Sequence, residues 1–132
     1  MDTPTPAFRR LLIVDDEEAI SFAMADFFSR SGYRVDRART KAEAEALLAG
    51  PEDYDLVIAD LRLSIHEPQA GIDLLRLARS RFPLVRMVLL TAYGSPEVEA
   101  ELAAFGDALL LSKPQPLLRI QEEVARLLEP PA

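Results

Sequence analysis

The sequence predicts an α/β fold, a doubly wound five-stranded parallel sheet with five helices. Apolar runs alternate five times with amphipathic helical patterns, which is typical of a sheet built from strand–helix units. Most runs are apolar at every position, as in strands that helices cover on both faces. Right-handed crossovers then make a doubly wound topology the natural arrangement. The 132 residues suffice for one domain with its own core.

Five apolar runs are expected to form the strands. They cover residues 11–14, 33–35, 56–59, 85–90 and 108–111. The second run is the weakest, because only Tyr33 and Val35 in it are apolar. The other four each run into polar residues, so polar side chains should follow the ends of these strands.

Helical spacing fills the intervals between the runs. Gly32 ends the first helix, and Thr40 with Glu43 forms a capping box at the start of the second. Ser95 followed by Pro96 is an N-cap with proline at the first position of the fourth helix. The expected core positions of the helices are, in chain order, Ile20, Met24 and Phe27; Ala44, Leu47 and Leu48; Ile72, Leu75, Ala78 and Phe82; Val98 and Leu102; and Leu117, Ile120, Val124, Leu127 and Leu128.

Composition excludes several functional classes. The absence of cysteine excludes a disulfide framework, a thiolate zinc site and a cysteine nucleophile. His66 is the single histidine, so a multi-histidine metal site is excluded as well, and we expect this residue on an exposed loop. The net charge of -7 argues against binding of nucleic acid by the domain itself.

Domain organisation and location follow from the chain ends and the length of the apolar runs. Both ends of the chain contain proline. We expect residues 1–8 to be a disordered fringe and residues 129–132 to be a tail or linker stump, with a domain at 9–128 between them. No apolar run approaches the roughly 18 residues of a membrane helix, and the N-terminus lacks a signal peptide pattern. We therefore expect a cytoplasmic domain that does not enter a membrane.

The polar residues after the strands carry the chemistry. Asp15 and Asp16 follow the first strand, Asp60 the third, Thr91 the fourth and Lys113 the fifth. The carboxyl ends of parallel strands share one edge of a sheet, where ligands bind. Three carboxylates meeting there would repel one another without a cation, and oxygen-only ligands suit Mg²⁺ or Mn²⁺. Together with the hydroxyl of Thr91 and the ammonium of Lys113, these carboxylates indicate phosphoryl transfer to a carboxylate nucleophile.

These strand-end residues, with Gly71 at the start of the third helix and Pro114 after the lysine, resemble the receiver domain of two-component response regulators. The resemblance covers residues 11–128. It implies a CheY-like, flavodoxin-like fold with the strand order 2-1-3-4-5. It also implies a signalling switch rather than an enzyme, one that catalyses its own phosphorylation and dephosphorylation. The partner would be a sensor histidine kinase or a histidine phosphotransfer protein, and a homodimer is left open.

The resemblance assigns the acceptor and metal ligands residue by residue. Asp60 is similar to the phosphoacceptor that attacks a phosphohistidine. Asp16 and Asp60 would ligate Mg²⁺ directly, and Asp15 would help through water. The backbone carbonyl of Arg62 would complete the protein ligands.

The resemblance also assigns the residues that act on the phosphoryl group. Thr91 is expected to hydrogen-bond it after transfer, and Lys113 to pair with it, or with the acceptor beforehand. In this family Pro114 commonly follows a cis peptide bond. Receivers usually carry an aromatic partner of the threonine switch where this chain has Leu110. Tyr93 is either its substitute or only an exposed loop tyrosine.

The loop after the acceptor departs from the family pattern. Asp60 and Gly71 are eleven residues apart, a longer interval than in most receivers, and Ser64 stands where a proline is usual. Residues 65–68 are expected to form a longer flap over the site. Arg62 and Tyr93 flank the acceptor loop and the threonine loop. Their bulk is expected to shield the phosphoryl group from water, so we predict slow autodephosphorylation.

Other functions are weighed against this one. Leu110 and the altered flap leave open a degenerate receiver used only for docking or dimerisation, although all five catalytic positions are filled. A flavodoxin-like cofactor binder would need a phosphate-cradling loop at 14–17, where three acids would repel a phosphate. Phe22 and Ala25 are either a docking face for a kinase or partly buried. If the chain is cut from a longer protein, the lost output domain would most often bind DNA, so transcription regulation is left open.

Overall fold

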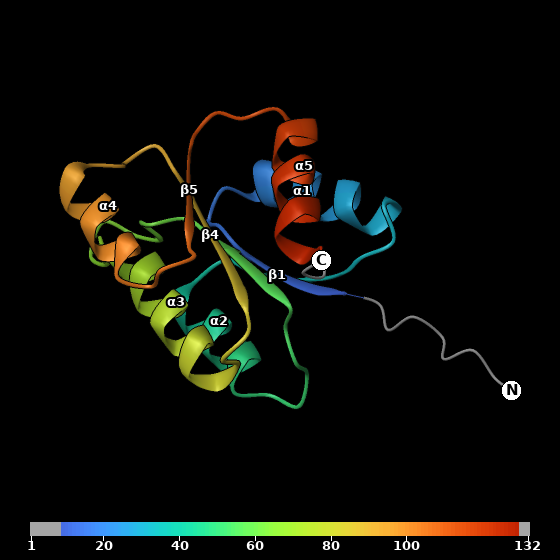
Figure 1. The fold of residues 1–132 in the computed structure, drawn as a ribbon, viewed down its shortest axis with the longest axis horizontal. Helices are drawn as coiled ribbons and strands as arrows, with labels where there is room; N and C mark the ends of the chain where they lie inside the picture. Colours follow the sequence, from blue (N-terminus) through green and yellow to red (C-terminus); the bar gives the residue numbers. More distant parts are fainter. Residues whose placement is uncertain (1–8, 130–132) are drawn as a thin grey trace, which may run out of the picture.

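Five parallel strands form one sheet in the order β2-β1-β3-β4-β5 (Figure 1). The computed structural model describes residues 9–129. The predicted fold class and strand order are both confirmed. The strand order reverses direction between β1 and β3. Sheets of this kind bind ligands at such a reversal, beyond the carboxyl ends of the strands. The strands are β1 (Arg10–Val14), β2 (Arg34–Ala38), β3 (Leu56–Ala59), β4 (Arg86–Thr91) and β5 (Leu109–Ser112).

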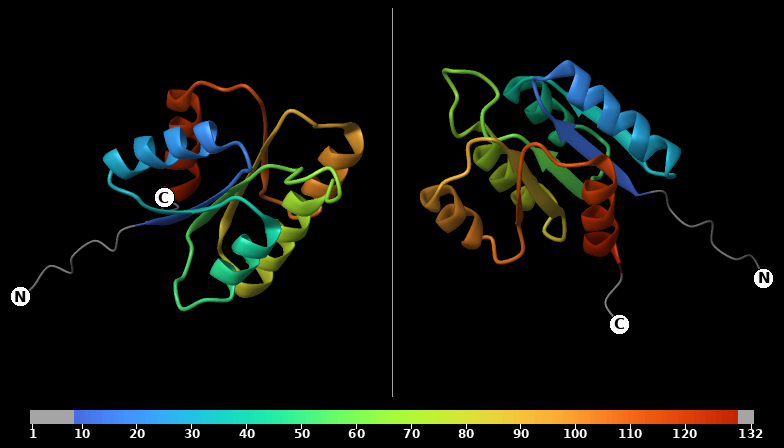
Figure 2. Two further views of the ribbon diagram at one scale, coloured as in Figure 1. Left: turned by 180° about the vertical axis from the view of Figure 1, so that it is seen from behind. Right: turned by 90° about the horizontal axis from the view of Figure 1, so that it is seen from above.

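Five helices cover the two faces of the sheet (Figures 1 and 2). The first and last helices lie together on one face, and the other three lie on the opposite face. The arrangement is the three-layer sandwich that the alternating sequence pattern predicts. The helices are α1 (Glu18–Arg30), α2 (Lys41–Leu48), α3 (Ala70–Arg81), α4 (Pro96–Ala103) and α5 (Leu117–Leu128).

The strands are apolar at successive positions because each contributes to two cores. In β1, Leu11 and Ile13 belong to the core on the side of α1 and α5. Leu12 and Val14 belong to the core on the side of α2, α3 and α4. All four side chains are buried. Burial on both faces explains why the sequence shows uninterrupted apolar runs instead of an alternating pattern.

The expected helix signals are present at three boundaries. Thr40 accepts a hydrogen bond from the Glu43 N–H, and the Glu43 side chain accepts one from the Thr40 N–H, so the predicted capping box forms. Ser95 accepts a bond from the Val98 N–H at the start of α4. Gly32 follows α1 at a φ of 98°, a backbone conformation that a side chain would strain.

The core stripe of α1 differs from the prediction at one phenylalanine. Met24 and Phe28 are fully buried, whereas the predicted Ile20 and Phe27 are only half-buried. Residues 27 and 28 both fit helical spacing from Met24, so the pattern alone does not decide between them. Phe28 takes the inner position, where its ring packs edge-on against both Tyr33 and Phe27.

Four strands differ from their predicted bounds: β1 begins one residue early, at Arg10, and β4 is displaced by one residue to Arg86–Thr91. β2 begins one residue later than the predicted 33–35 and runs on to Ala38. β2 is an edge strand, so polar side chains in it can find hydrogen-bond partners. Asp36, for example, accepts a hydrogen bond from the guanidinium of Arg10. β5 begins at Leu109 and includes Ser112, one residue beyond the apolar run.

Some predictions fall at or beyond the limits of the described residues. The fringe at 1–8 lies outside them, as does the tail at 129–132 except for Glu129. Within residues 9–129, no helix combines the length and the apolar character needed to cross a membrane. His66 is exposed on the loop before α3, as predicted.

Candidate functional site

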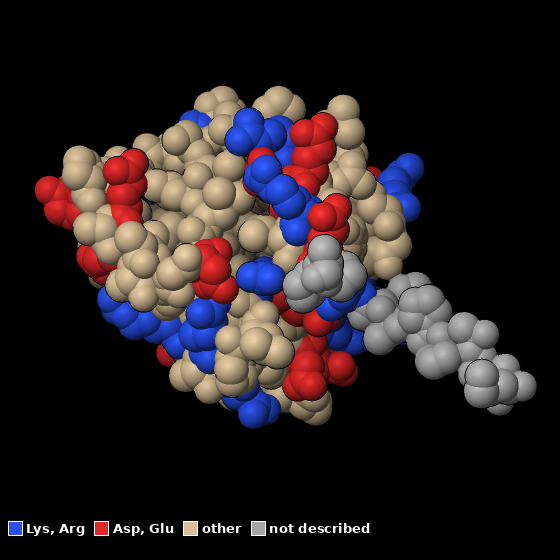
Figure 3. Space-filling model, viewed as in Figure 1, with Lys and Arg blue, Asp and Glu red and all other residues tan. Residues whose placement is uncertain are grey.

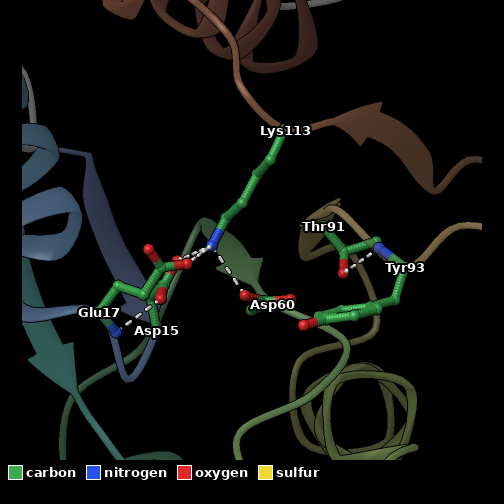
Figure 4. Close-up of polar contacts among 6 residues, drawn as sticks. All are labelled: Asp15, Glu17, Asp60, Thr91, Tyr93 and Lys113. Atoms are coloured by element: carbon green, nitrogen blue, oxygen red, sulfur yellow. Dashed lines mark hydrogen bonds and ion pairs between the residues drawn. The ribbon is translucent and has the colours of Figure 1, made fainter.

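The carboxyl ends of β1, β3, β4 and β5 bring the predicted site residues to one edge of the sheet. Asp15, Asp60 and Thr91 are almost completely buried, with 2%, 5% and 1% of their surface exposed. Asp16 is exposed beside them, and Lys113 reaches them from the end of β5 (Figure 4). Convergence of polar side chains from four strands matches the edge at which doubly wound sheets bind ligands.

Lys113 joins three carboxylates (Figure 4). Its Nζ lies 2.7 Å from Asp15 Oδ2 and 2.7 Å from Asp60 Oδ2. A third bond, of 3.0 Å, joins it to Glu17 Oε1, so all three N–H groups of the ammonium have acceptors. The Lys113–Pro114 peptide bond is cis. The lysine therefore contacts the acceptor carboxylate directly, as expected for Asp60 before phosphorylation.

The charges at this edge are unbalanced, and two of the acids, Asp15 and Asp60, are buried. Burial lowers the pKa of Lys113, but its bonds to the three carboxylates outweigh burial and raise that pKa above its usual range. Burial raises the pKa of Asp15 by more than the bonds from Lys113 and from the Glu17 N–H lower it. The lysine is thus held charged, yet one ammonium serves four neighbouring acids once Asp16 is included.

The three aspartates form an oxygen-only cluster. One carboxylate oxygen each from Asp15, Asp16 and Asp60 can be chosen so that all lie within 4.8 Å of one another. Asp60 Oδ1 is buried and has no hydrogen-bond partner among the described residues. A buried carboxylate oxygen without a donor is costly, and a cation would relieve both this cost and the mutual repulsion. The residues present therefore fit Mg²⁺ or Mn²⁺.

Gly71 allows α3 to begin directly against the acceptor loop. A Cβ at this position would lie 2.3 Å from the carbonyl oxygen of Asp60 and 2.8 Å from Leu61 Cα. The Gly71 N–H donates to the Leu61 carbonyl at 2.9 Å. No side chain fits between these backbones, so glycine is required for the start of α3 to pack against the residue that follows β3.

Thr91 and Tyr93 lie across Asp60 from Lys113 (Figure 4). The Thr91 hydroxyl oxygen accepts a hydrogen bond of 3.1 Å from the Tyr93 N–H. The guanidinium carbon of Arg62 lies 4.0 Å from the centroid of the Tyr93 ring. The loops that follow β3 and β4 are therefore in contact through the side chains of Arg62 and Tyr93. Arg62 is two residues past the acceptor, and Tyr93 is two residues past Thr91.

The flap after the acceptor is a tight turn. The Glu67 N–H donates to the Ser64 carbonyl at 3.1 Å, and the two residues form an isolated antiparallel bridge. Ile65 is exposed at the turn. Ser64 and Ile65 line a cavity of about 350 Å³ that also contains Asp60. The longer loop expected from the sequence thus lies over the acceptor.

Glu17 is a site residue that the sequence-based predictions do not name, and Leu110 lies apart from the acceptor cavity. No motif assigns Glu17 to the site, although it binds Lys113; a third acid directly after the aspartate pair is the signal that could have revealed it. Leu110, expected at the switch, does not line the acceptor cavity. It pairs in register with Leu89 and packs against the core on the α4 side of the sheet.

Comparison with known proteins decides the family. Residues 11–125 match the family model of the response regulator receiver domain. The chain belongs to this family. This receiver domain is 35% identical over 120 residues to the response regulator protein PilR of Pseudomonas aeruginosa, and the match covers 91% of the chain. It covers only 26% of PilR, so the chain spans about a quarter of that relative's length.

Solved structures share the receiver fold. A CheY-like response regulator receiver domain protein from Methanospirillum hungatei is similar with a TM-score of 0.82 and 27% identity, covering 91% of this chain and 93% of that chain. A response regulator from Burkholderia pseudomallei, solved with a phosphorylated aspartic acid, a calcium ion and citrate, is similar with a TM-score of 0.75 and 26% identity. That match covers 94% of this chain and 76% of the other. The CheY-like fold expected from the strand-end residues is confirmed.

Proposed function

We propose that this receiver domain accepts a phosphoryl group on Asp60 from a phosphohistidine of a sensor histidine kinase or a histidine phosphotransfer protein. The environment of Asp60 is the observation that carries the proposal. One carboxylate oxygen is bonded to Lys113, and the other is buried without a hydrogen-bond partner among residues 9–129. The Asp60 carboxylate therefore has two oxygens for two tasks: Oδ1, which has no donor, would ligate a cation, and Oδ2, held by Lys113, would form the new bond to phosphorus.

Transfer would proceed by positioning and charge neutralisation. An Asp60 oxygen attacks the phosphorus and forms a P–O bond as the P–N bond to the donor imidazole breaks. The imidazole leaves with the bonding electrons and takes up a proton. Lys113 already lies 2.7 Å from the acceptor carboxylate, so its ammonium can pair with a phosphoryl oxygen as negative charge arrives there.

Asp15, Asp16 and Asp60 would hold Mg²⁺ together with the backbone carbonyl of Arg62. The bound ion would neutralise the phosphoryl oxygens and the surrounding acids during transfer. The unbalanced acids and the unpartnered Asp60 Oδ1 support this assignment. A calcium ion and a phosphorylated aspartic acid occur together in the similar Burkholderia pseudomallei protein, which supports it further.

Thr91 would respond to the new charge. Its hydroxyl oxygen accepts a bond from the Tyr93 N–H, so the hydroxyl proton remains to be donated to a phosphoryl oxygen. Movement of Thr91 toward that oxygen would shift the loop between β4 and α4. The domain would then change the population of two surface arrangements and so act as a switch for a partner or an output domain.

A donor protein would approach over α1 and α5. A cavity of about 490 Å³ lies between these helices and is lined by apolar side chains such as Ile20 and Leu117, together with Lys113 of the site. Phe22 and Ala25 do not line this cavity, and the centroid of the exposed Phe22 ring lies 5.6 Å from the guanidinium carbon of Arg37 on β2. An apolar surface that adjoins the acceptor edge supports docking of a helical phosphotransfer domain there.

Nucleic acid is not expected to contact this domain. Figure 3 shows basic and acidic side chains interspersed on the face drawn, with acids gathered toward the α4 end instead of a continuous basic patch. α4 begins with Glu97 and Glu99 in its first turn. Any effect on transcription would therefore pass through a partner or a further domain.

The test is formation of an adduct on Asp60. The chain is incubated with Mg²⁺ and acetyl phosphate, and mass spectrometry is expected to detect one added phosphoryl group that is absent without Mg²⁺. Asp60→Ala is expected to abolish the adduct, whereas Asp26→Ala, which removes an exposed acid from α1, is expected to keep it. An adduct that survives in Asp60→Ala would contradict the proposal.

The rival is a degenerate receiver that only docks or dimerises. It predicts no adduct with acetyl phosphate and no binding of beryllofluoride in the presence of Mg²⁺. Leu110 in place of an aromatic residue and the longer flap favour this alternative, but the bonded Asp60–Lys113 pair and the acid cluster favour the phosphoacceptor.

A further inference from the structure

Glu17 is a side chain of the site to which the proposed transfer gives no role. Its Oε1 accepts a 3.0 Å bond from Lys113 Nζ, whereas Asp15 and Asp60 accept bonds of 2.7 Å. The Glu17 side chain is 56% exposed, and the two aspartate side chains are buried. Of these three acceptors, Glu17 thus makes the longest bond and can exchange it for a bond to water at the smallest cost.

The backbone of Glu17 is fixed although its side chain reaches solvent. The Glu17 N–H donates a 2.9 Å bond to Asp15 Oδ1, and its carbonyl accepts a 3.0 Å bond from the Ser21 N–H. Glu17 is the N-cap residue of α1, yet its side chain caps no N–H group in the described part of the helix. The carboxylate is bonded to Lys113 instead, so it can leave the lysine without unwinding α1.

The direction of phosphoryl transfer draws Lys113 away from Glu17. Figure 4 shows Glu17 and Asp15 on one side of the Lys113 ammonium. Asp60 and Thr91 lie on its other side. A phosphoryl group on Asp60 Oδ2 that bonds the Thr91 hydroxyl lies on this second side. Because Oδ2 loses its negative charge when it bonds to phosphorus, the ammonium follows the charge to the phosphoryl oxygens.

We propose that Glu17 is a positioning residue that restrains Lys113 beside α1 and releases it when Asp60 accepts a phosphoryl group. The proposal rests on phosphorylation of Asp60. Lys113 keeps its bond to the buried Asp15 and exchanges its bond to Glu17 for one to a phosphoryl oxygen. Because this exchange costs an ion-pair contact, Glu17 slows uptake of the phosphoryl group.

Release of Glu17 changes the boundary between two cavities. Glu17 lines both the acceptor cavity of about 350 Å³ and the apolar cavity of about 490 Å³ between α1 and α5. While Glu17 is bonded to Lys113, the ammonium neutralises its charge. After release, the carboxylate is a negative charge in water at the edge of the surface on which a donor would dock. Phosphorylation therefore alters this surface without moving a helix.

NMR of the lysine ammonium groups observes the release directly. The chain has two lysines, Lys41 and Lys113, so ¹⁵N-labelled lysine gives two side-chain signals, which Lys41→Arg assigns. Without Mg²⁺, the Lys113 signal is expected to differ between the unmodified chain and Glu17→Ala. The Lys41 signal, from a lysine paired with Asp73, is expected to stay unchanged.

A mimic of the phosphoryl group then decides whether the contact breaks. Mg²⁺ with beryllofluoride is expected to bring the Lys113 signals of the unmodified chain and Glu17→Ala together, because neither chain then has the bond to residue 17. A difference between the two Lys113 signals that persists in the complex would overturn the release.

The rate of phosphoryl uptake from acetyl phosphate with Mg²⁺ measures the restraint. Glu17→Ala is expected to raise the rate constant by about two- to five-fold, the effect of losing an exposed ion pair. Glu17→Asp keeps the charge but is one methylene too short for the bond to Lys113, so it is expected to match Glu17→Ala. Glu18→Ala removes a neighbouring acid that pairs with Arg37 and Arg39, and it is expected to keep the unmodified rate.

The outcomes separate this proposal from the function on which it rests. If the unmodified chain neither takes up a phosphoryl group on Asp60 nor binds beryllofluoride, the proposed function fails and the release of Glu17 with it. If Asp60 is phosphorylated but Glu17→Ala is unchanged or slower, the restraint alone is overturned. It is also overturned if Glu17→Asp keeps the unmodified rate or Glu18→Ala is as fast as Glu17→Ala, because negative charge alone would then explain the effect.

Discussion

Both ends of the sheet are rich in acidic side chains, but the two ends differ in the hydrogen-bond donors and positive charges that they supply to these acids. At the amino end, Asp36 accepts a 2.6 Å bond from the Tyr54 hydroxyl and a 3.1 Å bond from Arg10. The Arg10 guanidinium also pairs with Glu52 at 3.3 Å, and its backbone N–H donates to Asp55 at 2.8 Å. Each of these acids thus has an arginine, a hydroxyl or a backbone donor.

At the carboxyl end, the acids are not all matched by a hydrogen-bond donor or a positive charge of their own. Lys113 is shared by three carboxylates, Asp16 adds a fourth, and Asp60 Oδ1 has no donor among the described residues. The amino end is organised to stabilise the fold, whereas the carboxyl end keeps an excess of negative charge that a cation can use. Local rules of polar satisfaction are broken at the edge where the function is proposed.

The largest effect is expected when bulk is added at the carboxyl end. Gly71→Ala would place a Cβ 2.3 Å from the Asp60 carbonyl oxygen. Because the obstructing atoms are backbone, we expect unfolding to become easier by about 3 kcal/mol, the upper part of the range for overpacking. Urea unfolding measures it. Gly50→Ala, whose Cβ would come no closer than 3.4 Å to another atom, is the control, and equal losses in both would refute the close packing of α3.

Mg²⁺ should act on the carboxyl end alone. A ligand that binds only the folded state at a hundred-fold excess over its Kd adds about 2.7 kcal/mol to the free energy of unfolding. We expect saturating Mg²⁺ to raise Tm in the unmodified chain, with most of the rise lost in Asp16→Asn. Asp36→Asn at the amino end should keep the rise. A rise of the same size in Asp16→Asn would show that the acid cluster is not the site.

The fold was accessible from the sequence because its signals are local and periodic. Continuous apolar runs identify strands buried on both faces, and Thr40 with Glu43 locates the start of α2 by capping alone. The missed details depend on tertiary contacts. Phe27 and Phe28 are equivalent by spacing, and only the packing of Phe28 against Tyr33 separates them. β2 extends past Val35 because Asp36 finds partners on other elements.

Part of the site could also be predicted from the sequence, because it follows from the positions of the strands. Parallel strands align their carboxyl ends, so Asp15, Asp60 and Lys113 could be placed together before any geometry was known. A third acid after the aspartate pair is a signal for Glu17, but an acid at that position equally fits the start of a helix, so spacing alone does not place it against Lys113. The stacking of Arg62 on Tyr93 depends on the relative position of two loops, which periodicity does not determine.

Removing one charge at each end should change stability in opposite directions. Asp36→Asn weakens the bonds from Tyr54 and Arg10, so unfolding is expected to become easier by about 1–3 kcal/mol. Asp16→Asn without Mg²⁺ relieves repulsion within the acid cluster, so it should make unfolding harder. Urea midpoints in Mg²⁺-free buffer compare the two. A loss of stability in both variants would contradict the difference between the ends.

The smallest effect concerns the hydroxyl of Tyr54 at the amino end. Burial and the bond to Asp36 raise the pKa of Tyr54 above its ordinary value of 10.0. The neutral phenol is thus favoured by folding, so its contribution is complete below 10.0 and declines as pH rises above that value. Tyr54→Phe should lose about 1 kcal/mol at neutral pH and show a shallower alkaline decline. Tyr33→Phe, outside the Asp36 network, should decline as the unmodified chain does; parallel alkaline slopes for Tyr54→Phe and the unmodified chain would show that this network does not couple stability to pH.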